Sequence, residues 1–326
     1  MNLTVILGQT CSGKTGLSID LAHYYQSIGQ SVWIVGCDSR QIYQSLNIGT
    51  AKISGEWSTT PTHQNLPISR PAIYQNQQYL FEGISHFFID YIDPKTEYSL
   101  LEFLLDFTEL FNSLPASHLP NQVILTGGTG LWAQAIVDQY QLGVVRDEYQ
   151  IQYQNLQKEL NEKSLQELQQ LYQNLQKEAE TSTFKELNES DFANSRRLIS
   201  TIIRSKTSDW IDPIIYPTFE TTRVFAISRE SEDLKNRITT RIHERIEQGL
   251  LDEVKSLQYL GRKRLLDLGL EYRQTQLFLE GELSESNWID SLITKNIQYA
   301  KRQKTWLNRM KGLVWVEGLG EILSVG

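Results

Sequence analysis

Short apolar runs alternate with amphipathic stretches over the first 140 residues. Three of these runs have the length and composition of buried strands: residues 3–7, 31–36 and 122–126. Apolar positions recur at helical spacing over 17–28, and residues 99–102 (SLLE) have capping-box spacing before an apolar helix that runs toward Leu114. Buried strands that alternate with helices predict an α/β fold, in which helices flank a parallel sheet on both faces.

The pattern changes near residue 140. Residues 147–188 are rich in Gln, Glu and Lys, and their leucines recur at helical spacing, which predicts an inserted helical subdomain. These leucines are more typical of a helix core than of a ligand site. A late strand at 223–227 returns the chain to the sheet, and a long helix is predicted from about Ser286 to Met310. The predicted division is a core at 1–142, a helical insertion at 143–206 and a C-terminal part at 207–326.

One segment of the predicted core shows no periodicity. Residues 54–83 contain three of the eight prolines and many Gln and Asn residues. Long segments of this kind are uncommon inside compact domains. We therefore expect 54–83 to form an exposed insertion.

Composition narrows the functional class. The net charge of −8 argues against a chain that coats nucleic acid indiscriminately, but residues 295–311 contain six Lys or Arg and no acidic residue, which predicts a local basic face. Two cysteines exclude a disulfide framework and a four-cysteine zinc module. Since no apolar run reaches about 18 residues, we expect a cytoplasmic chain without a membrane span, and we expect it to act as a monomer.

The strongest motif is at residues 8–15, which read GQTCSGKT between the first predicted strand and the first predicted helix. This fits the phosphate-loop pattern G-x-x-x-x-G-K-[ST], in which backbone N–H groups converge on a phosphate at a helix N-terminus. Lys14 is expected to contact the outer phosphate oxygens, and Thr15 is expected to offer its hydroxyl to Mg²⁺. Cys11 is interpreted as a small loop residue rather than a reactive thiol. The expected phosphate site consists of Gly8, Thr10, Cys11, Ser12, Gly13, Lys14 and Thr15.

Two further polar loops directly follow predicted strands. Residues 37–43 (CDSRQIY) follow the second strand, and residues 127–131 (GGTGL) follow the third. Because the carboxyl ends of parallel strands face the ligand crevice, Asp38 and Thr129 are expected beside the phosphate loop. A carboxylate at this position can hold Mg²⁺, accept a proton from a substrate, or only cap the turn that follows.

The phosphate loop and these two segments belong to a set of six motifs. The motifs are residues 8–15, 38–43, 47–52 (NIGTAK), 89–94 (IDYIDP), 127–131 and 299–306 (YAKRQKTW). In their order and context they resemble the tRNA dimethylallyltransferases, also called tRNA isopentenyltransferases, over most of the chain. The resemblance implies an enzyme that moves the dimethylallyl group of dimethylallyl diphosphate to N6 of the adenosine just 3′ of a tRNA anticodon, with Mg²⁺ and with release of diphosphate.

The resemblance also implies roles for individual residues. Asp38 matches the family's proposed general base, Thr129 matches a threonine near the bridging oxygen, and Arg229 matches a diphosphate-binding arginine. The target adenine is stacked in the anticodon loop and has to be flipped out. Residues expected to read this base are Ser39, Arg40 and Gln41. Residues expected to contact the rest of the tRNA anticodon stem-loop are Arg196, Arg197, Arg273, Lys301, Arg302, Gln303 and Trp306.

Three positions depart from the family pattern. Gln9 stands in place of a proline, Trp132 in place of a tyrosine and Glu271 in place of a glycine. The first two changes remove no charged or catalytic group. The Glu271 carboxylate, in contrast, is expected to repel a phosphate of the tRNA.

Other functions are compatible with a phosphate loop. The main alternative is an adenylate isopentenyltransferase that uses free AMP, ADP or ATP, but a free nucleotide requires neither the basic face at 295–311 nor the helical insertion. A P-loop kinase would transfer a phosphoryl group instead. A non-catalytic RNA-binding protein is disfavoured because Lys14, Asp38 and Thr129 are all present.

Overall fold

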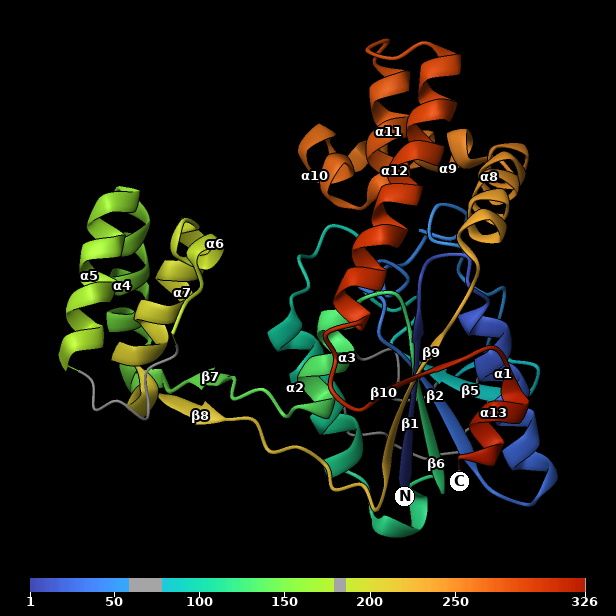
Figure 1. Cartoon of the computed structure of the whole chain (residues 1–326), viewed down its shortest axis with the longest axis horizontal. Helices are drawn as coiled ribbons and strands as arrows, with labels where there is room; N and C mark the ends of the chain where they lie inside the picture. Colours follow the sequence, from blue (N-terminus) through green and yellow to red (C-terminus); the bar gives the residue numbers. More distant parts are fainter. Residues whose placement is uncertain (59–77, 179–185, 326) are drawn as a thin grey trace. The chain divides into compact units, whose positions relative to one another are not determined.

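The computed structural model describes residues 1–58, 78–178 and 186–325 (Figure 1). The chain forms two compact units. The first unit consists of residues 1–140 and 216–326, and the second consists of residues 141–215. The first unit contains the sheet, the three loops identified above and the C-terminal helices.

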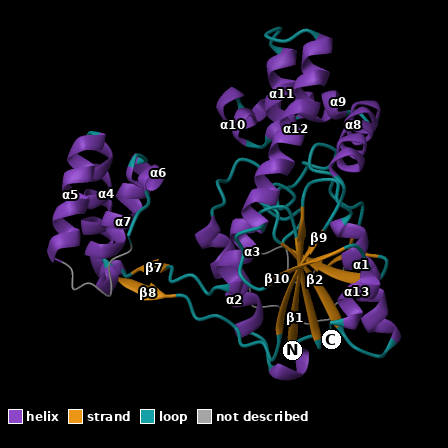
Figure 2. Cartoon of the chain, viewed as in Figure 1, coloured by secondary structure: helices purple, strands orange, loops and turns teal. Residues whose placement is uncertain are grey.

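An eight-stranded sheet forms the centre of the first unit within the described residues (Figure 2). Its strands, in spatial order, are β10 (Leu313–Val316), β9 (Thr222–Ile227), β1 (Asn2–Gly8), β6 (Gln122–Thr126), β2 (Val32–Gly36), β5 (Ile84–Phe87), β4 (Gln78–Phe81) and β3 (Glu56–Ser58). The pairs from β10 to β5 are parallel, and β4 and β3 add antiparallel pairs at one edge. In the central register Val5 lies between Leu125 and Val224. The predicted α/β fold with a mainly parallel sheet is therefore confirmed.

Helices cover both faces of the sheet (Figure 2). The helices are α1 (Lys14–Ser27) and α13 (Leu319–Ser324) on one face, and α2 (Leu100–Asn112) and α3 (Gly130–Val137) on the other. Apolar residues of α1 and α13 pack in one core with Ile6 and Ile34 of the sheet. On the opposite face, Phe103 stacks on Trp132 with ring centroids 4.4 Å apart. The predicted capping box is present, since the Ser99 hydroxyl accepts from the Glu102 amide and the Glu102 carboxylate accepts from the Ser99 amide.

The C-terminal helices lie beyond the carboxyl ends of the parallel strands (Figure 1). They are α8 (Ser231–Glu247), α9 (Leu250–Ser256), α10 (Arg262–Asp267), α11 (Leu270–Leu279) and α12 (Glu285–Leu307). The long helix predicted from Ser286 to Met310 corresponds to α12. None of the helices in the described residues is both long enough and apolar enough to cross a membrane.

Within its described residues, the second unit consists of helices between two short strands that pair with each other. These elements are β7 (Gly143–Val145), α4 (Gln150–Glu162), α5 (Leu165–Glu178), α6 (Glu189–Phe192), α7 (Ser195–Lys206) and β8 (Ile211–Pro213). Leucines such as Leu160 and Leu168 are fully buried in its core, as their helical spacing indicated. The unit extends to residue 215, past the boundary predicted at residue 206, because β8 pairs antiparallel with β7.

The segment 54–83 differs from the prediction where the structure describes it. Its two flanks form the edge strands β3 and β4, and Tyr79 of β4 is buried with its hydroxyl donating to the Ile53 carbonyl at 2.6 Å. These flanks are therefore paired strands at the edge of the sheet, in which Tyr79 is buried whereas Glu56, Glu82 and Gly83 are exposed. Strands of three and four residues are too short to show an alternating pattern. Residues 59–77 lie outside the described residues.

Candidate active site

Three loops meet at the carboxyl edge of the sheet. They follow β1, β6 and β2, which are adjacent strands in the order β1-β6-β2. The Thr129 amide donates to the Cys37 carbonyl at 3.2 Å, and the Ser39 amide donates to Thr129 Oγ1 at 3.0 Å. The loop after β6 is therefore hydrogen-bonded to the loop that carries Asp38, as expected for neighbouring parallel strands.

The phosphate loop has the backbone geometry that its sequence requires. Gly8 and Gly13 have φ values of 155° and 98°, and a Cβ at Gly8 would lie 2.6 Å from the Ser12 hydroxyl oxygen. Lys14 begins α1, and its Nζ donates to the Gln9 carbonyl at 2.8 Å. The ammonium therefore lies over the loop, where a phosphate would be held.

The surroundings of Lys14 lower the pKa of its ammonium group and so disfavour the charged form. Burial and the nearby Arg241 guanidinium lower the pKa of Lys14 to about 8, and Asp38 acts in the opposite direction. An ammonium that is buried and repelled by a second cation is stabilised by any anion that binds beside it. The site is thus suited to a phosphate or diphosphate group.

Asp38 uses its two oxygens differently. Its Oδ1 accepts the backbone N–H groups of Arg40 at 2.9 Å and Gln41 at 3.3 Å, so it caps the turn. Its Oδ2 has no hydrogen-bond partner among the described residues, and it lies where a Cβ on Gly128 would approach to 3.0 Å. Glycine at position 128 therefore keeps this oxygen accessible from the cavity. The two interpretations of Asp38, turn cap and proton acceptor, apply to different oxygens of one carboxylate.

A cavity of about 610 Å³ connects these groups. Its walls come from the three loops and from α8, α11 and α12. Of the residues predicted to form the site, it is lined by Thr10, Lys14, Thr15, Asp38, Ser39, Arg40, Gln41, Thr129, Arg273, Arg302 and Gln303. Residues predicted to bind the donor and residues predicted to read the base thus line one cavity, whose size is within the range of small-molecule sites.

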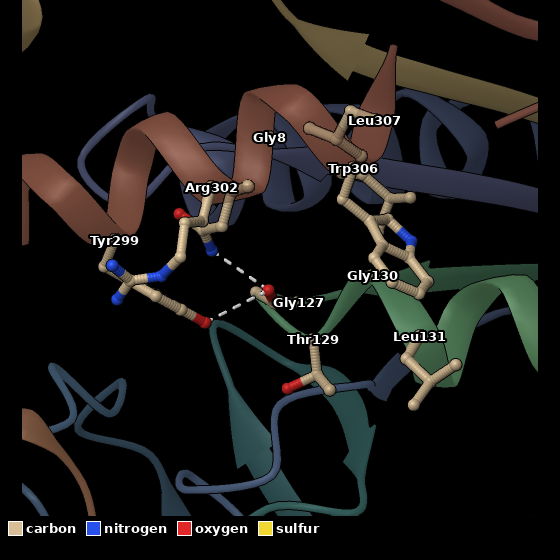
Figure 3. Close-up of a pocket in the computed structure, with 12 residues that line it drawn as sticks. Gly8, Gly127, Thr129, Gly130, Leu131, Tyr299, Arg302, Trp306 and Leu307 are labelled. Carbon is tan, nitrogen blue, oxygen red and sulfur yellow. Dashed lines mark hydrogen bonds between the residues drawn. The ribbon is translucent and has the colours of Figure 1, made fainter. Parts of the chain in front are cut away.

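Gln303 has a different environment from the one expected. It was predicted to contact tRNA, but its Oε1 accepts the Thr10 amide at 2.7 Å and its Nε2 donates to the Gly128 carbonyl at 2.9 Å. The Tyr299 hydroxyl donates to the same carbonyl at 3.4 Å (Figure 3). Gln303 is buried and connects the phosphate loop to the loop after β6.

The predicted basic face of α12 is divided between opposite sides of the helix. Arg302 lines the main cavity, whereas Lys301 and Lys304 line a second cleft of about 290 Å³ that they share with Arg229 of the segment before α8. Arg229 Nε donates to the Ser12 carbonyl at 3.1 Å, so this arginine contacts the phosphate loop from outside the main cavity.

Trp306 does not line the main cavity. It lines a smaller cavity of about 220 Å³ together with Gly130 and Leu307 (Figure 3). A Cβ on Gly130 would lie 2.7 Å from the indole ring, so a glycine at this position lets Trp306 approach the start of α3. Figure 3 shows its ring beside Gly130 rather than beside Thr129.

Glu271 is not a free carboxylate. Its Oε1 accepts from Arg245 at 2.6 Å and from the Asn296 side-chain amide at 3.2 Å, and the Arg245 side chain is only 5% exposed. The expected repulsion of a phosphate is therefore offset by a paired guanidinium. Arg241, Arg245 and Asn296 were not identified from the sequence. The sequence did contain one indication: Arg241 and Arg245 are four residues apart on a predicted helix, which places them on the same face.

The two arginines predicted in the helical insertion belong to the second unit. Arg196 is exposed in the first turn of α7, and Arg197 forms an ion pair with Asp191. No group of three or more His, Cys, Asp or Glu able to hold a metal is present in the described part of the chain. Among the oxygen groups that line the main cavity, the exposed Thr15 hydroxyl and the Asp38 carboxylate belong to the loops that carry the predicted site.

Comparisons with known proteins show the family to which the chain belongs. The model of the family described as IPP transferase matches residues 41–310, and the chain belongs to this family of prenyltransferases. It is 30% identical to tRNA dimethylallyltransferase 1 of Geotalea uraniireducens, over 99% of this chain and 95% of that protein. It is 31% identical to tRNA dimethylallyltransferase 2 of Shewanella sediminis, over 98% of this chain and 95% of that protein.

Solved structures support the same assignment. The full-length tRNA isopentenylpyrophosphate transferase from Bacillus halodurans superposes with a TM-score of 0.62 at 25% identity, covering 99% of this chain and 94% of that one. A eukaryotic dimethylallyltransferase acting on tRNA has the same fold, with a TM-score of 0.59 at 19% identity over 97% of this chain and 74% of that one.

Proposed function

We propose that this chain transfers the dimethylallyl group of dimethylallyl diphosphate to N6 of the adenosine 3′-adjacent to the anticodon in tRNA, and releases diphosphate. The observation that carries the proposal is that the phosphate loop, Asp38 and Thr129 line one cavity. A donor held by its diphosphate on the loop then has its allylic carbon facing the carboxylate side of the cavity. Family membership adds the class of reaction, prenyl transfer.

The diphosphate end of the cavity stabilises the leaving group. When the allylic C–O bond breaks, its electron pair leaves with the diphosphate, so cations and N–H donors at this end act more strongly in the transition state than in the ground state. The loop amides and Lys14 are placed to act there. Thr15, with the diphosphate oxygens and water, would hold Mg²⁺, which supplies further neutralisation of the leaving group when bound.

The carboxylate end activates the acceptor. The N6 amino group of adenine is a weak nucleophile because its lone pair is delocalised into the ring. As the N6–C bond forms, one N6 proton passes to Oδ2 of Asp38, the oxygen left unengaged by the turn. Thr129 Oγ1 donates to Ser39 Oγ at 3.3 Å. On binding of the donor, this O–H would turn from Ser39 to the bridging oxygen of the diphosphate, the role that the resemblance implies for Thr129.

Base recognition is assigned to the loop after β2. Gln41 Nε2 donates to the Thr50 and Ala51 carbonyls at 3.0 and 3.2 Å, so its amide is held in one orientation. Its Oε1 is then available to accept from the adenine edge once the base has been flipped out of the anticodon loop. Arg40, Arg273 and Arg302 line the same cavity and would neutralise phosphates that flank the flipped adenosine.

The acceptor is tested by offering two substrates. The purified chain is incubated with Mg²⁺, labelled dimethylallyl diphosphate and either unmodified tRNA or AMP. We expect label to appear in tRNA as isopentenyladenosine and not in AMP, and the Asp38→Asn variant serves as the inactive control. Product formed only on AMP would replace tRNA by a free adenylate as acceptor.

A further inference from the structure

Glu253 of α9 contacts the loop at residues 47–51 through its carboxylate. Its Oε2 accepts the backbone N–H groups of Asn47 at 2.9 Å and Ile48 at 2.7 Å, and its Oε1 accepts that of Gly49 at 2.9 Å. Three successive amides therefore converge on one side chain, which lies 204 positions after Gly49 in the sequence. Successive N–H groups of this kind form an anion-binding concavity, and here the anion belongs to the protein itself.

A buried phenol completes the surroundings of this carboxylate. The Tyr272 hydroxyl of α11 donates to Glu253 Oε1 at 2.7 Å. Burial and the Glu253 charge raise the pKa of Tyr272 well above its ordinary value, so the phenol remains a donor at neutral pH. Its ring also packs against Gly49, where a Cβ would lie 2.6 Å from it. The amides and the phenol thus form charge-assisted hydrogen bonds to one carboxylate, and such bonds are stronger than neutral ones.

The loop held in this way is bonded in turn to the side chain of Gln41. The Gln41 Nε2 donates to the carbonyls of Thr50 and Ala51 at 3.0 and 3.2 Å. Ala51 has a φ of 52°, in the left-handed region that residues other than glycine rarely adopt, and such a backbone persists only where its surroundings hold it. These contacts connect the Glu253 carboxylate, through the 47–51 loop, to the amide of Gln41.

The carboxylate lies behind the wall of the main cavity. The cavity is lined by Gln41 and by residues 49–51, whereas Glu253 is not one of the described residues that line it. A base bound in the cavity therefore meets the Gln41 side chain and the loop, and an effect of Glu253 on that base passes through them. Side chains that read a ligand are held in their rotamers by supporting hydrogen bonds of this kind.

We propose that Glu253 is a positioning residue for the acceptor base: it holds the 47–51 loop so that Gln41 presents its Oε1 to the N6 amino group of the target adenine. The inference rests on the proposed function for the identity of that base. An unheld loop would allow the Gln41 amide several orientations, and ordering it on binding would cost conformational entropy. Because Glu253 orders the loop in advance, the hydrogen bond to N6 adds more of its free energy to the preference for adenine.

The test compares two anticodon stem-loop RNAs, which carry either adenosine or purine riboside at the position 3′-adjacent to the anticodon. Purine riboside lacks the 6-amino group. Equilibrium binding to the full chain is measured without donor. We expect the unaltered chain to prefer the adenosine RNA by about 10-fold or more, and Glu253→Gln to reduce this preference by about 3- to 10-fold, because an amide offers one acceptor oxygen instead of two. Affinities for the purine riboside RNA and for inorganic diphosphate are expected to change by less than about 3-fold, since neither depends on the N6 contact.

Asp252→Asn is the matched control. Asp252 precedes Glu253 in the first turn of α9, is exposed and forms an ion pair with Lys255, so its replacement removes the same charge without touching the loop. We expect this variant to keep the preference of the unaltered chain. Tyr272→Phe removes one donor and leaves the carboxylate, and it is expected to cause a smaller loss of the same kind as Glu253→Gln. Thermal melts establish that each variant is folded.

A second background separates positioning from a general effect on the fold. Gln41→Leu removes the group that reads the amino group, so adding Glu253→Gln to it is expected to cause no further loss of preference, as for two residues that act through one hydrogen bond. A further loss in this background would show that Glu253 acts on the fold rather than on Gln41, and would overturn the inference.

Two other results would overturn it as well. One is equal binding of the two RNAs by the unaltered chain, and the other is an unchanged preference in Glu253→Gln. Because no donor is present, a chain that recognises the amino group through Glu253 and Gln41 but forms no isopentenyladenosine contradicts the proposed function and leaves this inference standing.

Discussion

Gln303 on α12 accepts the backbone N–H of Thr10 at 2.7 Å, across 293 positions of sequence. The same side chain donates to the Gly128 carbonyl at 2.9 Å, so one amide fixes the distance between the phosphate loop and the loop after β6. In the proposed function, the phosphate loop binds the diphosphate and the loop after β6 brings Thr129 to its bridging oxygen. We therefore infer that Gln303 positions the phosphate loop relative to Thr129.

Replacing Gln303 by leucine removes both bonds and leaves a partly buried N–H and a carbonyl without partners. Each lost hydrogen bond of this type costs about 0.5–1.5 kcal/mol. We expect Gln303→Leu to lower kcat/KM for dimethylallyl diphosphate by about 10-fold or more, measured by steady-state kinetics at saturating tRNA. Gln298→Leu is the control, since Gln298 is exposed on the same helix and lines the same cavity. Equal effects of the two changes would contradict a bridging role for Gln303.

Asp38→Asn separates the two functions of this side chain. The asparagine oxygen can still accept the Arg40 and Gln41 amides, so the turn is retained, but the side chain no longer takes a proton. We expect the single-turnover rate of prenyl transfer to fall by about 10²- to 10⁴-fold, with diphosphate affinity changed by less than about 3-fold. Asp38→Ala, which also removes the cap, is expected to lose stability in addition. Turnover that persists in Asp38→Asn would remove the carboxylate from the role of base.

Local sequence patterns were sufficient for the elements that position the site. The strand at 122–126 and the capping box before α2 are present as predicted, because both depend on residues close together in the chain. The phosphate loop was equally visible, since its glycines, its lysine and its threonine lie within eight consecutive residues. The carboxyl-edge rule for parallel sheets then placed Asp38 and Thr129 together.

Long-range contacts account for what the sequence did not reveal. Arg241 contacts a loop 231 positions earlier, and Arg245 contacts Glu271, 26 positions later on another helix. In isolation each arginine has the pattern of a solvated charge on an amphipathic helix. The division of the basic face of α12, in contrast, was predictable in principle, because adjacent residues of a helix point in directions about 100° apart.

This division leads to a prediction for tRNA binding. Arg302 lines the main cavity, whereas Lys301 lines the cleft shared with Arg229. We expect Arg302→Ala to weaken tRNA binding and to reduce the slope of log K against log salt by about one phosphate contact. Lys301→Ala, which removes an equal charge from the other side of the helix, is expected to change the affinity by less than about 3-fold. Filter binding at several salt concentrations measures both, and a larger effect of Lys301→Ala would show that the tRNA backbone reaches the second cleft.

The lowered pKa of Lys14 predicts how donor binding depends on pH. In the free protein this pKa is about 8, below the ordinary 10.5, because burial and Arg241 disfavour the ammonium. A bound diphosphate favours the ammonium and raises the pKa again, so binding takes up a proton wherever free Lys14 is partly deprotonated. The contribution of Lys14 to diphosphate affinity is therefore greatest below pH 8. It falls as the pH rises above 8, and the fall approaches about 10-fold per pH unit.

Proton uptake can be assigned to Lys14 by comparison with an always-charged side chain. Calorimetry of diphosphate binding at pH 8 in buffers of different ionisation enthalpy gives the number of protons taken up. We expect the unaltered chain to take up about half a proton more than the Lys14→Arg variant, because the diphosphate contributes equally to both measurements. Identical values for the two proteins would mean that the Lys14 ammonium is fully formed before the anion binds. In that case burial and the Arg241 guanidinium would not have lowered the pKa of Lys14 in the free protein.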